Sequence, residues 1–319
     1  MVRNLSNDKE RKIIMTRDEL LEKLDAAQTN EEIKELGEEL LELEPESPYG
    51  KLAVWETMSY EDGIDNLYLL RDALDSIRAI VDAKDNPAII DEDRDALAYC
   101  TIMMNLGYAL LSEGEIQEAY DIAKEFANFD DEGTFPSRTL LYRCMLDLGL
   151  YNEILETLEN DSVESVAGGH ARAIAMLEIG AEAGEVRDAV NYAISLSPDV
   201  PFFVLSIWEF PDPEEDLEEE MEEIVDDAAY VAEPWCKSDK RLAALSAPTF
   251  LFGYLTGRLD DQKEIDMLRS GYEEAGVADR IEKFKKHLED MENNGKDPDE
   301  IDSDALGETA EILEILMGK

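Results

Sequence analysis

Apart from carboxylates, the side chains that most often carry chemistry are scarce in this sequence of 319 residues. It has two histidines, His170 and His287, and three cysteines, Cys100, Cys144 and Cys236. No C-x-x-C, H-x-x-x-H or E-x-x-H spacing occurs, so neither a zinc site nor a Cys–His nucleophile is indicated. Cys100 and Cys144 lie in apolar helical stretches and are predicted to be small core residues.

Motifs that bind phosphate or calcium are also missing from the sequence. No G-x-G-x-x-G, P-loop or G-x-S-x-G motif occurs. The segment 131–133, Asp-Glu-Gly, lacks the alternating oxygens and the terminal glutamate of a calcium loop. Because the chain has 78 acidic residues, pairs of carboxylates arise by chance and identify no acid–base site. We therefore expect no catalytic residue, no metal, no cofactor and no enzymatic activity.

The charge of the chain restricts its partners. The 78 acidic residues oppose 29 basic ones, which gives a formal net charge of -49. Such a field repels nucleic acid and anionic membranes, and it favours basic proteins or cationic ligands. A second interpretation is that the acidity only keeps the protein soluble, because charge runs are usually solvated faces. No run approaches 18 apolar residues and the first fifteen residues lack an apolar signal core, so we expect a cytoplasmic protein.

A repeat of 35 residues organises the middle of the chain, where Gly114, Gly149 and Gly184 are evenly spaced. The same apolar or small residues recur around each glycine. Eight positions before it lie Leu106, Leu141 and Met176, and five and nine positions after it lie Ala119 and Ala123, Ile154 and Leu158, and Ala189 and Ala193. This period predicts three helical hairpins, in which one helix ends at the glycine and the next begins just after it.

The first of these units resembles a tetratricopeptide repeat. Leu106-Gly107, Gly114, Ala119 and Ala123 match the pattern W-x2-L-G-x2-Y followed by small residues on the second helix. The sequence departs from that pattern at the tryptophan position, which holds Met103, Arg138 and Ala173, and at the tyrosine position, which holds Leu110, Met145 and Gly180. The resemblance covers about residues 95–201, closes at Pro201, and implies an all-α, tetratricopeptide-like helical-hairpin solenoid.

A second resemblance extends over residues 15–250. It rests on three segments, 197–201 (Ser-Pro-Asp-Val-Pro), 227–230 (Asp-Ala-Ala-Tyr) and Trp235. Their order is similar to an uncharacterised bacterial branch of tetratricopeptide proteins related to the suppression-of-tumorigenicity-seven family, which implies a scaffold and no activity. We expect degenerate hairpins over 1–94, three repeats over 95–201, an acidic helical continuation over 202–260 and C-terminal helices, which would cap the array, over 261–319.

Local signals place the flanking helices. Thr16 and Glu19 form a predicted capping box, and Ser47-Pro48 has the cap and first residue of a helix. Apolar spacing predicts one long helix over 63–83, two helices over 265–274 and 281–291, and an amphipathic stretch over 304–317. The block 209–227 holds twelve acids and no base, yet its apolar residues keep helical spacing. It is either a docking surface for a basic partner or a solvated helix face.

The concave surface of a helical solenoid is where a ligand is expected. Counted from the glycines, the predicted groove is lined by Met104, Tyr108, Ser112, Thr139, Arg143, Asp147, Ile174, Glu178 and Glu182. The mixed lining favours a scaffold that binds a partner's peptide or helix. Two alternatives remain open: the C-terminal stretch 304–317 fills the groove, or the chain is an acidic chaperone or a mimic of nucleic-acid charge that binds basic proteins.

Overall fold

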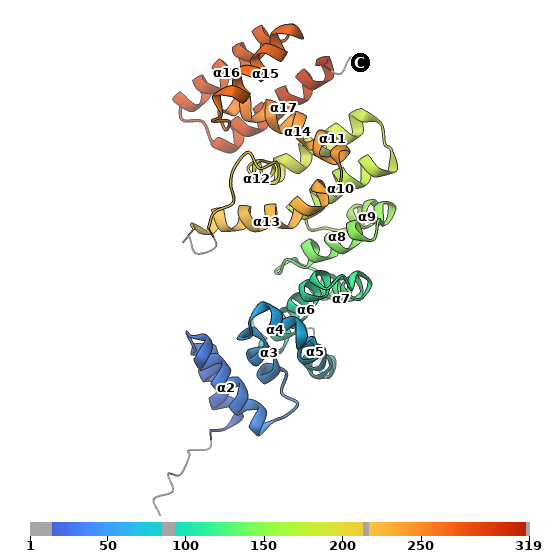
Figure 1. Cartoon of the computed structure of the whole chain (residues 1–319), viewed down its shortest axis with the longest axis vertical. Coiled ribbons are helices and arrows are strands. Elements are labelled where there is room, and N and C mark those ends of the chain that lie inside the picture. The colour runs from blue at the N-terminus through green and yellow to red at the C-terminus, as the bar shows by residue number, and fades with distance from the viewer. Residues whose placement is uncertain (1–14, 85–92, 213–216, 317–319) are drawn as a thin grey trace, which may run out of the picture. The chain divides into compact units, whose positions relative to one another are not determined.

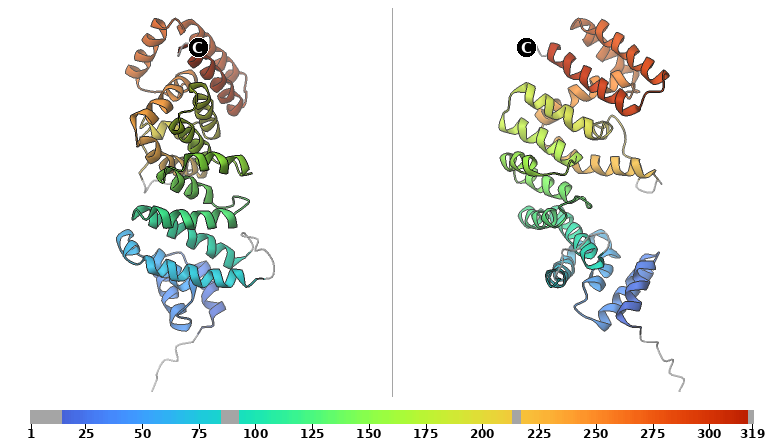
Figure 2. Two further views of the ribbon diagram at one scale, coloured as in Figure 1. Left: turned by 90° about the vertical axis from the view of Figure 1, so that its right-hand side faces the viewer. Right: turned by 180° about the vertical axis from the view of Figure 1, so that it is seen from behind.

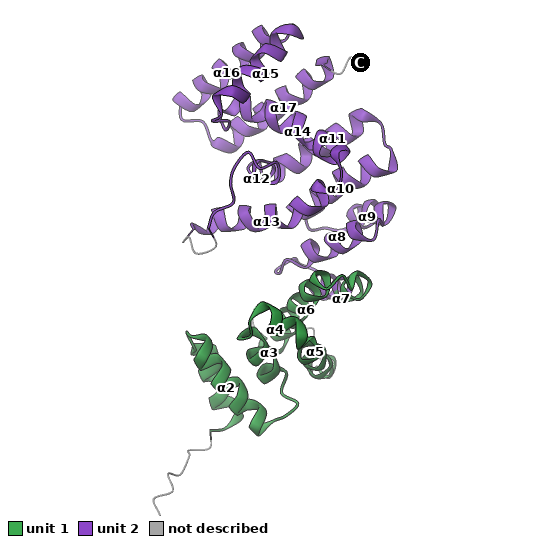
Figure 3. Cartoon of the chain, in the orientation of Figure 1, with its two compact units in different colours: residues 1–122 green, residues 123–319 purple. Residues whose placement is uncertain are grey.

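The computed structural model describes residues 15–84, 93–212 and 217–316. These residues form 17 helices and no strand, so the predicted all-α class is confirmed. The chain divides into two compact units, residues 1–122 and 123–319 (Figure 3). The predicted boundaries after residues 94, 201 and 260 lie inside these units. Parts of several sequence predictions lie outside the described residues: 1–14, which belong to the stretch without a signal core and to the hairpins expected over 1–94; 85–92 of the same hairpins; 213–216 of the acidic block; and 317–319 of the expected C-terminal helices.

The first unit begins with short capped helices. Its elements are α1 (Arg17–Ala26), α2 (Asn30–Leu43), α3 (Pro48–Glu56), α4 (Tyr60–Asp65), α5 (Leu67–Asp82), α6 (Arg94–Ser112) and the start of α7 (Ile116–Phe129). The capping box of Thr16 and Glu19 is confirmed, and Ser47 caps a helix whose first residue is Pro48. The core lies where α5 packs on α3 and α6, around Leu70, Ile77 and Ile102.

The single helix predicted over 63–83 is wrong, because the chain turns at Asn66 between α4 and α5. The backbone of Asn66 leaves the helical region, with φ −114° and ψ 25°. Its side-chain amide donates to the carbonyl of Asp62 at 2.8 Å, and its backbone N–H donates to the carbonyl of Gly63 at 3.1 Å. These local bonds compete with the helical pattern, which is a common effect of asparagine side chains.

The second unit continues with ten more helices after α7. They are α8 (Ser137–Asp147), α9 (Tyr151–Asn160), α10 (Val166–Ile179), α11 (Ala183–Leu196), α12 (Val200–Val204), α13 (Glu219–Cys236), α14 (Asp239–Thr256), α15 (Gln262–Glu274), α16 (Ala278–Asn293) and α17 (Pro298–Leu316). Neighbours in sequence pack together, as in α8 with α9 and α10 with α11 (Figure 2). The last helix, α17, packs on α11 and α14. No helix of the described ranges is long and apolar enough to cross a membrane.

Two of the three predicted turn glycines are confirmed, and the third is wrong. Gly114 and Gly149 end α6 and α8 in the left-handed region, with φ of 76° and 69°. Gly184 instead lies in the first turn of α11, and the left-handed residue that ends α10 is Gly180, with φ 77°. The reason is a cap: the backbone N–H of Glu182 donates to the side chain of Glu185 at 3.1 Å, so α11 starts at residue 183.

Candidate functional site

The groove positions predicted for the first repeat lie along one face of α6. Met104, Tyr108 and Ser112 follow each other at four-residue spacing, which places them on successive turns. Met104 and Tyr108 are half-buried, whereas Ser112 is exposed and its hydroxyl donates to the carbonyl of Tyr108 at 3.1 Å. This face therefore offers a partly accessible aromatic and thioether surface within the first unit.

In the second unit the structure brings three of the predicted groove residues together. Thr139 and Arg143 of α8 and Ile174 of α10 line one cavity of about 10 Å³. The opposite wall of this cavity is α13, which contributes Tyr230, Val231 and Pro234 and packs on both α8 and α10 (Figure 1). The space holds about one water molecule. This stretch of the predicted groove is thus covered by a helix of the same chain, and the covering helix is α13 rather than residues 304–317.

Arg143 binds the covering helix instead of facing open solvent. Pro234 has no N–H, so it cannot donate the usual helical hydrogen bond to the carbonyl of Tyr230 in α13. Arg143 Nη1 donates to that carbonyl at 3.4 Å, and Arg143 also forms ion pairs with Glu233 of α13 and, at 3.0 Å, with Asp147 of its own helix. Arg143 is therefore part of the contact between α8 and α13.

Glu178 and Asp147 are neutralised within the fold. Arg241 of α14, which is 4% exposed, donates to Glu178 at 2.6 Å and to the carbonyl of Pro234 at 2.7 Å. Asp147 is paired with Arg143 and with Lys237, which follows α13 directly. Glu182 lies at the N-terminal cap of α11 and not on α10, because α10 ends earlier than the glycine period predicts. Glu178 and Asp147 thus face cations inside the chain, whereas Glu182 is exposed.

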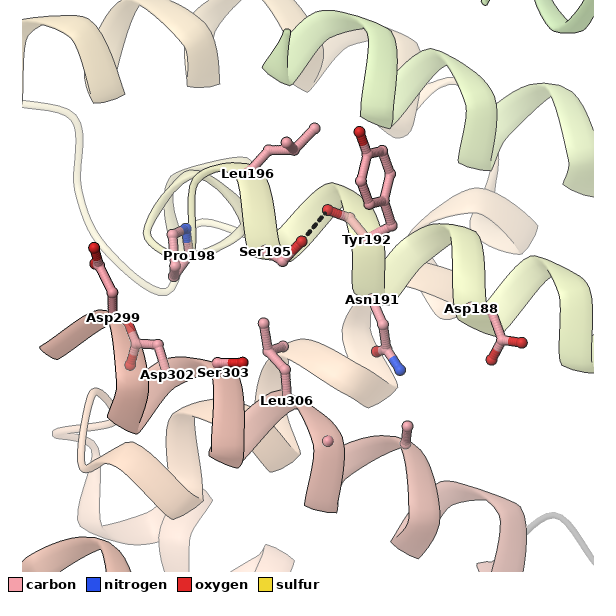
Figure 4. Close-up of a pocket in the computed structure, with 12 residues that line it drawn as sticks. Asp188, Asn191, Tyr192, Ser195, Leu196, Pro198, Asp299, Asp302, Ser303 and Leu306 are labelled. Carbon is pink, nitrogen blue, oxygen red and sulfur yellow. Dashed lines mark hydrogen bonds between the residues drawn. The ribbon is translucent and has the colours of Figure 1, made fainter. Parts of the chain in front are cut away.

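A second concavity, between α11 and α17, is open and much larger. Its volume is about 710 Å³, within the range of about 300–1,000 Å³ that is typical of ligand pockets. It is lined by Asp188, Asn191, Tyr192, Ser195, Leu196, Pro198, Asp299, Asp302, Ser303, Leu306, Gly307 and Ala310. We call it the α11/α17 cleft. In Figure 4, Asn191 and Leu306 point into the space between the two helices, and Tyr192 points away from α17.

The α11/α17 cleft is rich in hydrogen-bond acceptors and has no lysine, arginine or histidine in its lining. Arg258 neutralises Asp302 through two bonds of 2.8 and 2.7 Å. Asp188 lies 3.7 Å from the nearest guanidinium nitrogen of Arg187 and its side chain is 72% exposed. The side-chain oxygen of Asn191 is buried and accepts no hydrogen bond from the described residues. A guest that carries positive charge and N–H groups would complement these atoms.

Sequence patterns give no signal for this cleft. Its two walls are more than a hundred residues apart in the sequence, and they meet because α17 returns to pack on α11. The amphipathic spacing over 304–317 predicts that this stretch is a helix with a buried face, and the structure buries Leu306, Ile312 and Leu313. It does not predict which helix receives that face, so Asp188, Asn191 and Asp299 are absent from the predicted site.

Comparison with known proteins adds no family to these observations. No protein-family model matches the chain, and no curated protein or solved structure was found to be similar to it. Within the described ranges, no three His, Cys, Asp or Glu side chains are grouped so that they could hold a metal ion. The features of the described residues that bear on function are therefore the α11/α17 cleft and the covered face of α8 and α10.

Proposed function

We propose that this chain is a non-enzymatic, cytoplasmic interaction scaffold of tetratricopeptide type, which binds a basic peptide or helix of a protein partner in the α11/α17 cleft. The observation that carries the proposal is the lining of that cleft, which combines open volume, the exposed carboxylates of Asp188 and Asp299, and no lysine, arginine or histidine. The net charge of -49 adds a field that attracts a basic segment and repels nucleic acid and anionic membranes. The helical hairpins at Gly114 and Gly149 support the repeat architecture.

A second candidate is an acidic chaperone or charge mimic that binds basic proteins without a defined pocket. It is favoured by the first two turns of α13, where Glu219, Glu220, Glu222 and Glu223 are all exposed. No lysine or arginine occurs between residues 209 and 236. Here binding would depend on the number of charges on the partner and fall steeply with salt, with little effect of the cleft residues.

The test is fluorescence anisotropy with a labelled peptide rich in lysine and arginine, compared with a peptide in which every basic residue is replaced by glutamate. We expect the basic peptide to bind and the acidic one not to bind. The double substitution Asp188→Asn, Asp299→Asn should weaken binding about tenfold, because each lost charge-assisted contact contributes of order 1 kcal/mol or less at an exposed site.

The matched control is Glu35→Gln, Glu38→Gln on α2, which removes two charges at exposed positions of the first unit. This control should leave the affinity nearly unchanged. Equal weakening by the cleft and control pairs, together with a larger loss from Glu219→Gln, Glu220→Gln, would favour the charge mimic. No binding of the basic peptide at low salt would contradict both candidates.

A further inference from the structure

The contact between α10 and α13 is centred on a buried hydrogen bond. His170 of α10 and Trp235 of α13 are both 0% exposed, and the indole Nε1–H of Trp235 donates to Nδ1 of His170 at 2.9 Å. The two rings meet edge to face, with centroids 5.9 Å apart. An indole can only donate, so it needs an acceptor when it is buried. Nδ1 is an acceptor only while the imidazole is neutral and its proton is on Nε2.

The surroundings of His170 oppose its protonation. Nε2 has no hydrogen-bond partner among the described residues. The titratable or charged side chains that line the adjoining cavity are Tyr142 and Arg143 from α8 and Tyr230 from α13, and the lining contains no carboxylate and no residue of α9 or α11. Burial lowers the pKa of His170 to about 4. The only full charge in the lining is therefore a cation, which would repel an imidazolium.

Protonation and the Trp235 bond exclude each other. An imidazolium has an N–H on both nitrogens and offers no lone pair. The N–H of the indole would then face the N–H of the imidazolium inside an apolar contact, and a buried unpaired donor is unfavourable. One water molecule in the adjoining cavity cannot accept from the indole N–H and from both ring N–H groups, so full solvation of the imidazolium requires α13 to leave the surface of α10.

We propose that α13 is a movable cover over the face of α8 and α10, held in place by the His170–Trp235 hydrogen bond and released when His170 is protonated. The buried residues of α13, Ala228, Val231, Pro234 and Trp235, all lie in its C-terminal half, and α13 also packs on α12 and α14, to which it stays attached when it leaves α8 and α10. Release uncovers Thr139, Arg143 and Ile174, which are the groove residues that the repeat pattern predicts. The proposal concerns the cover and holds whether or not the α11/α17 cleft binds basic peptides.

The sign of the pH effect follows from the two states of the histidine. With α13 closed, the pKa of His170 is about 4, and with α13 released it returns towards its ordinary value of 6.5. The closed state is therefore fully favoured above about pH 6.5, and its ratio to the open state falls by up to tenfold per pH unit down to about pH 4. The whole change is roughly 300-fold.

Amide hydrogen exchange of the full chain tests the cover. Exchange over 219–236 is measured relative to 183–196 of α11 and corrected for the intrinsic effect of pH, in the wild type and in His170→Asn. Asparagine does not titrate, and its side-chain oxygen can accept from Trp235 in place of Nδ1. Between about pH 7 and about pH 4.5 we expect relative protection of α13 to fall by roughly sixtyfold more in the wild type than in His170→Asn, which keeps every other ionisable group of α13.

The other titrating groups near α13 are common to both proteins. Glu233, Asp147 and Asp227 are unchanged in His170→Asn, so the difference between the two profiles reports His170. Identical pH profiles in the two proteins would overturn the proposal.

Trp235→Phe keeps a ring and loses the donor, and it should expose α13 to exchange already at neutral pH. Wild-type protection of α13 in this variant would also overturn the proposal. Circular dichroism shows whether each variant is folded. Either variant tests the proposal on its own if it is folded.

Discussion

Asp227 shows at the scale of one residue how a dense acidic sequence creates local instability. It is half-buried on α13, with Glu223 and Asp226 close by. Burial, followed by the repulsion of these two neighbours, raises the pKa of Asp227 to about 6 from an ordinary value of 3.8. The charged form is thus disfavoured in the folded chain relative to the unfolded chain. Above about pH 6 this carboxylate reduces the free energy of unfolding, and the loss disappears as the pH falls towards 4.

Asp227→Asn should therefore stabilise the protein at neutral pH. We expect the free energy of unfolding to rise by about 1 kcal/mol at pH 7, a value reduced from the full pKa difference because the group is partly solvated. The gain should vanish near pH 4, where Asp227 is already neutral in both states. Urea unfolding of the wild type and the variant at both pH values is the measurement. Asp226→Asn, at the exposed neighbour, should give a smaller gain, and a destabilised Asp227→Asn variant would contradict the argument.

At the scale of elements, the left-handed glycines define where each hairpin turns. Gly149 and Gly180 end α8 and α10, and they are 31 residues apart, whereas Gly114 and Gly149 are 35 apart. The 35-residue spacing of Gly184 from Gly149 therefore reflects no equivalent position in the fold. The decisive difference is the backbone angle: φ is 77° at Gly180, and Gly184 is helical. A residue with a Cβ atom is strained at position 180 and favourable at position 184.

Alanine substitutions at these two glycines should change stability in opposite directions. Gly180→Ala should lower the free energy of unfolding by about 1 kcal/mol, because alanine is strained in the left-handed region. Gly184→Ala should raise it by about 0.5 kcal/mol, since alanine favours the helix and the nearest atom to its Cβ would be the Arg187 guanidinium at 3.8 Å. Urea unfolding measures both. A higher free energy of unfolding for Gly180→Ala, or a lower one for Gly184→Ala, would contradict this assignment and place the turn at Gly184, where the 35-residue period predicts it.

The sequence predicts elements better than their contacts. Thr16 with Glu19 and Ser47 with Pro48 predict helix starts correctly, because caps act within one turn. The break at Asn66 is missed, since apolar spacing continues through it and the deciding bond is made by one amide. The α11/α17 cleft is missed because it depends on which helix packs on α11. The contacts of Trp235 with His170 and of Arg143 with Tyr230 are also missed, because they are set by helix packing.

At the scale of the whole molecule, charge is the dominant property. A formal charge of -49 on 319 residues produces self-repulsion that opposes the compact state. Ion pairs relieve it locally, as in Arg258 with Asp199 and Asp302 or Lys51 with Glu46 and Asp72. The 29 basic residues cannot neutralise 78 acids, so most of the repulsion remains to be screened by salt.

Salt should therefore stabilise the fold. Between about 20 mM and about 300 mM NaCl the screening length shortens to well below 10 Å, and the thermal midpoint measured by circular dichroism should rise by a few degrees. Choline chloride at the same ionic strength should have the same effect, because screening does not depend on the identity of the cation. A rise with Na⁺ alone would indicate a specific ion site, and a fall with both salts would show that the ion pairs outweigh the net repulsion.

The three cysteines differ in access in a way that suits experiments on α13. Cys100 and Cys144 are 0% exposed, and burial, with Asp147 nearby, raises the pKa of the Cys144 thiol to about 12. Cys236 is exposed at the last residue of α13. Thiol reagents attack accessible thiolates. A maleimide dye or spin label should thus attach to the natural chain at one position, beside Trp235, and report the movement of this helix without any engineered residue.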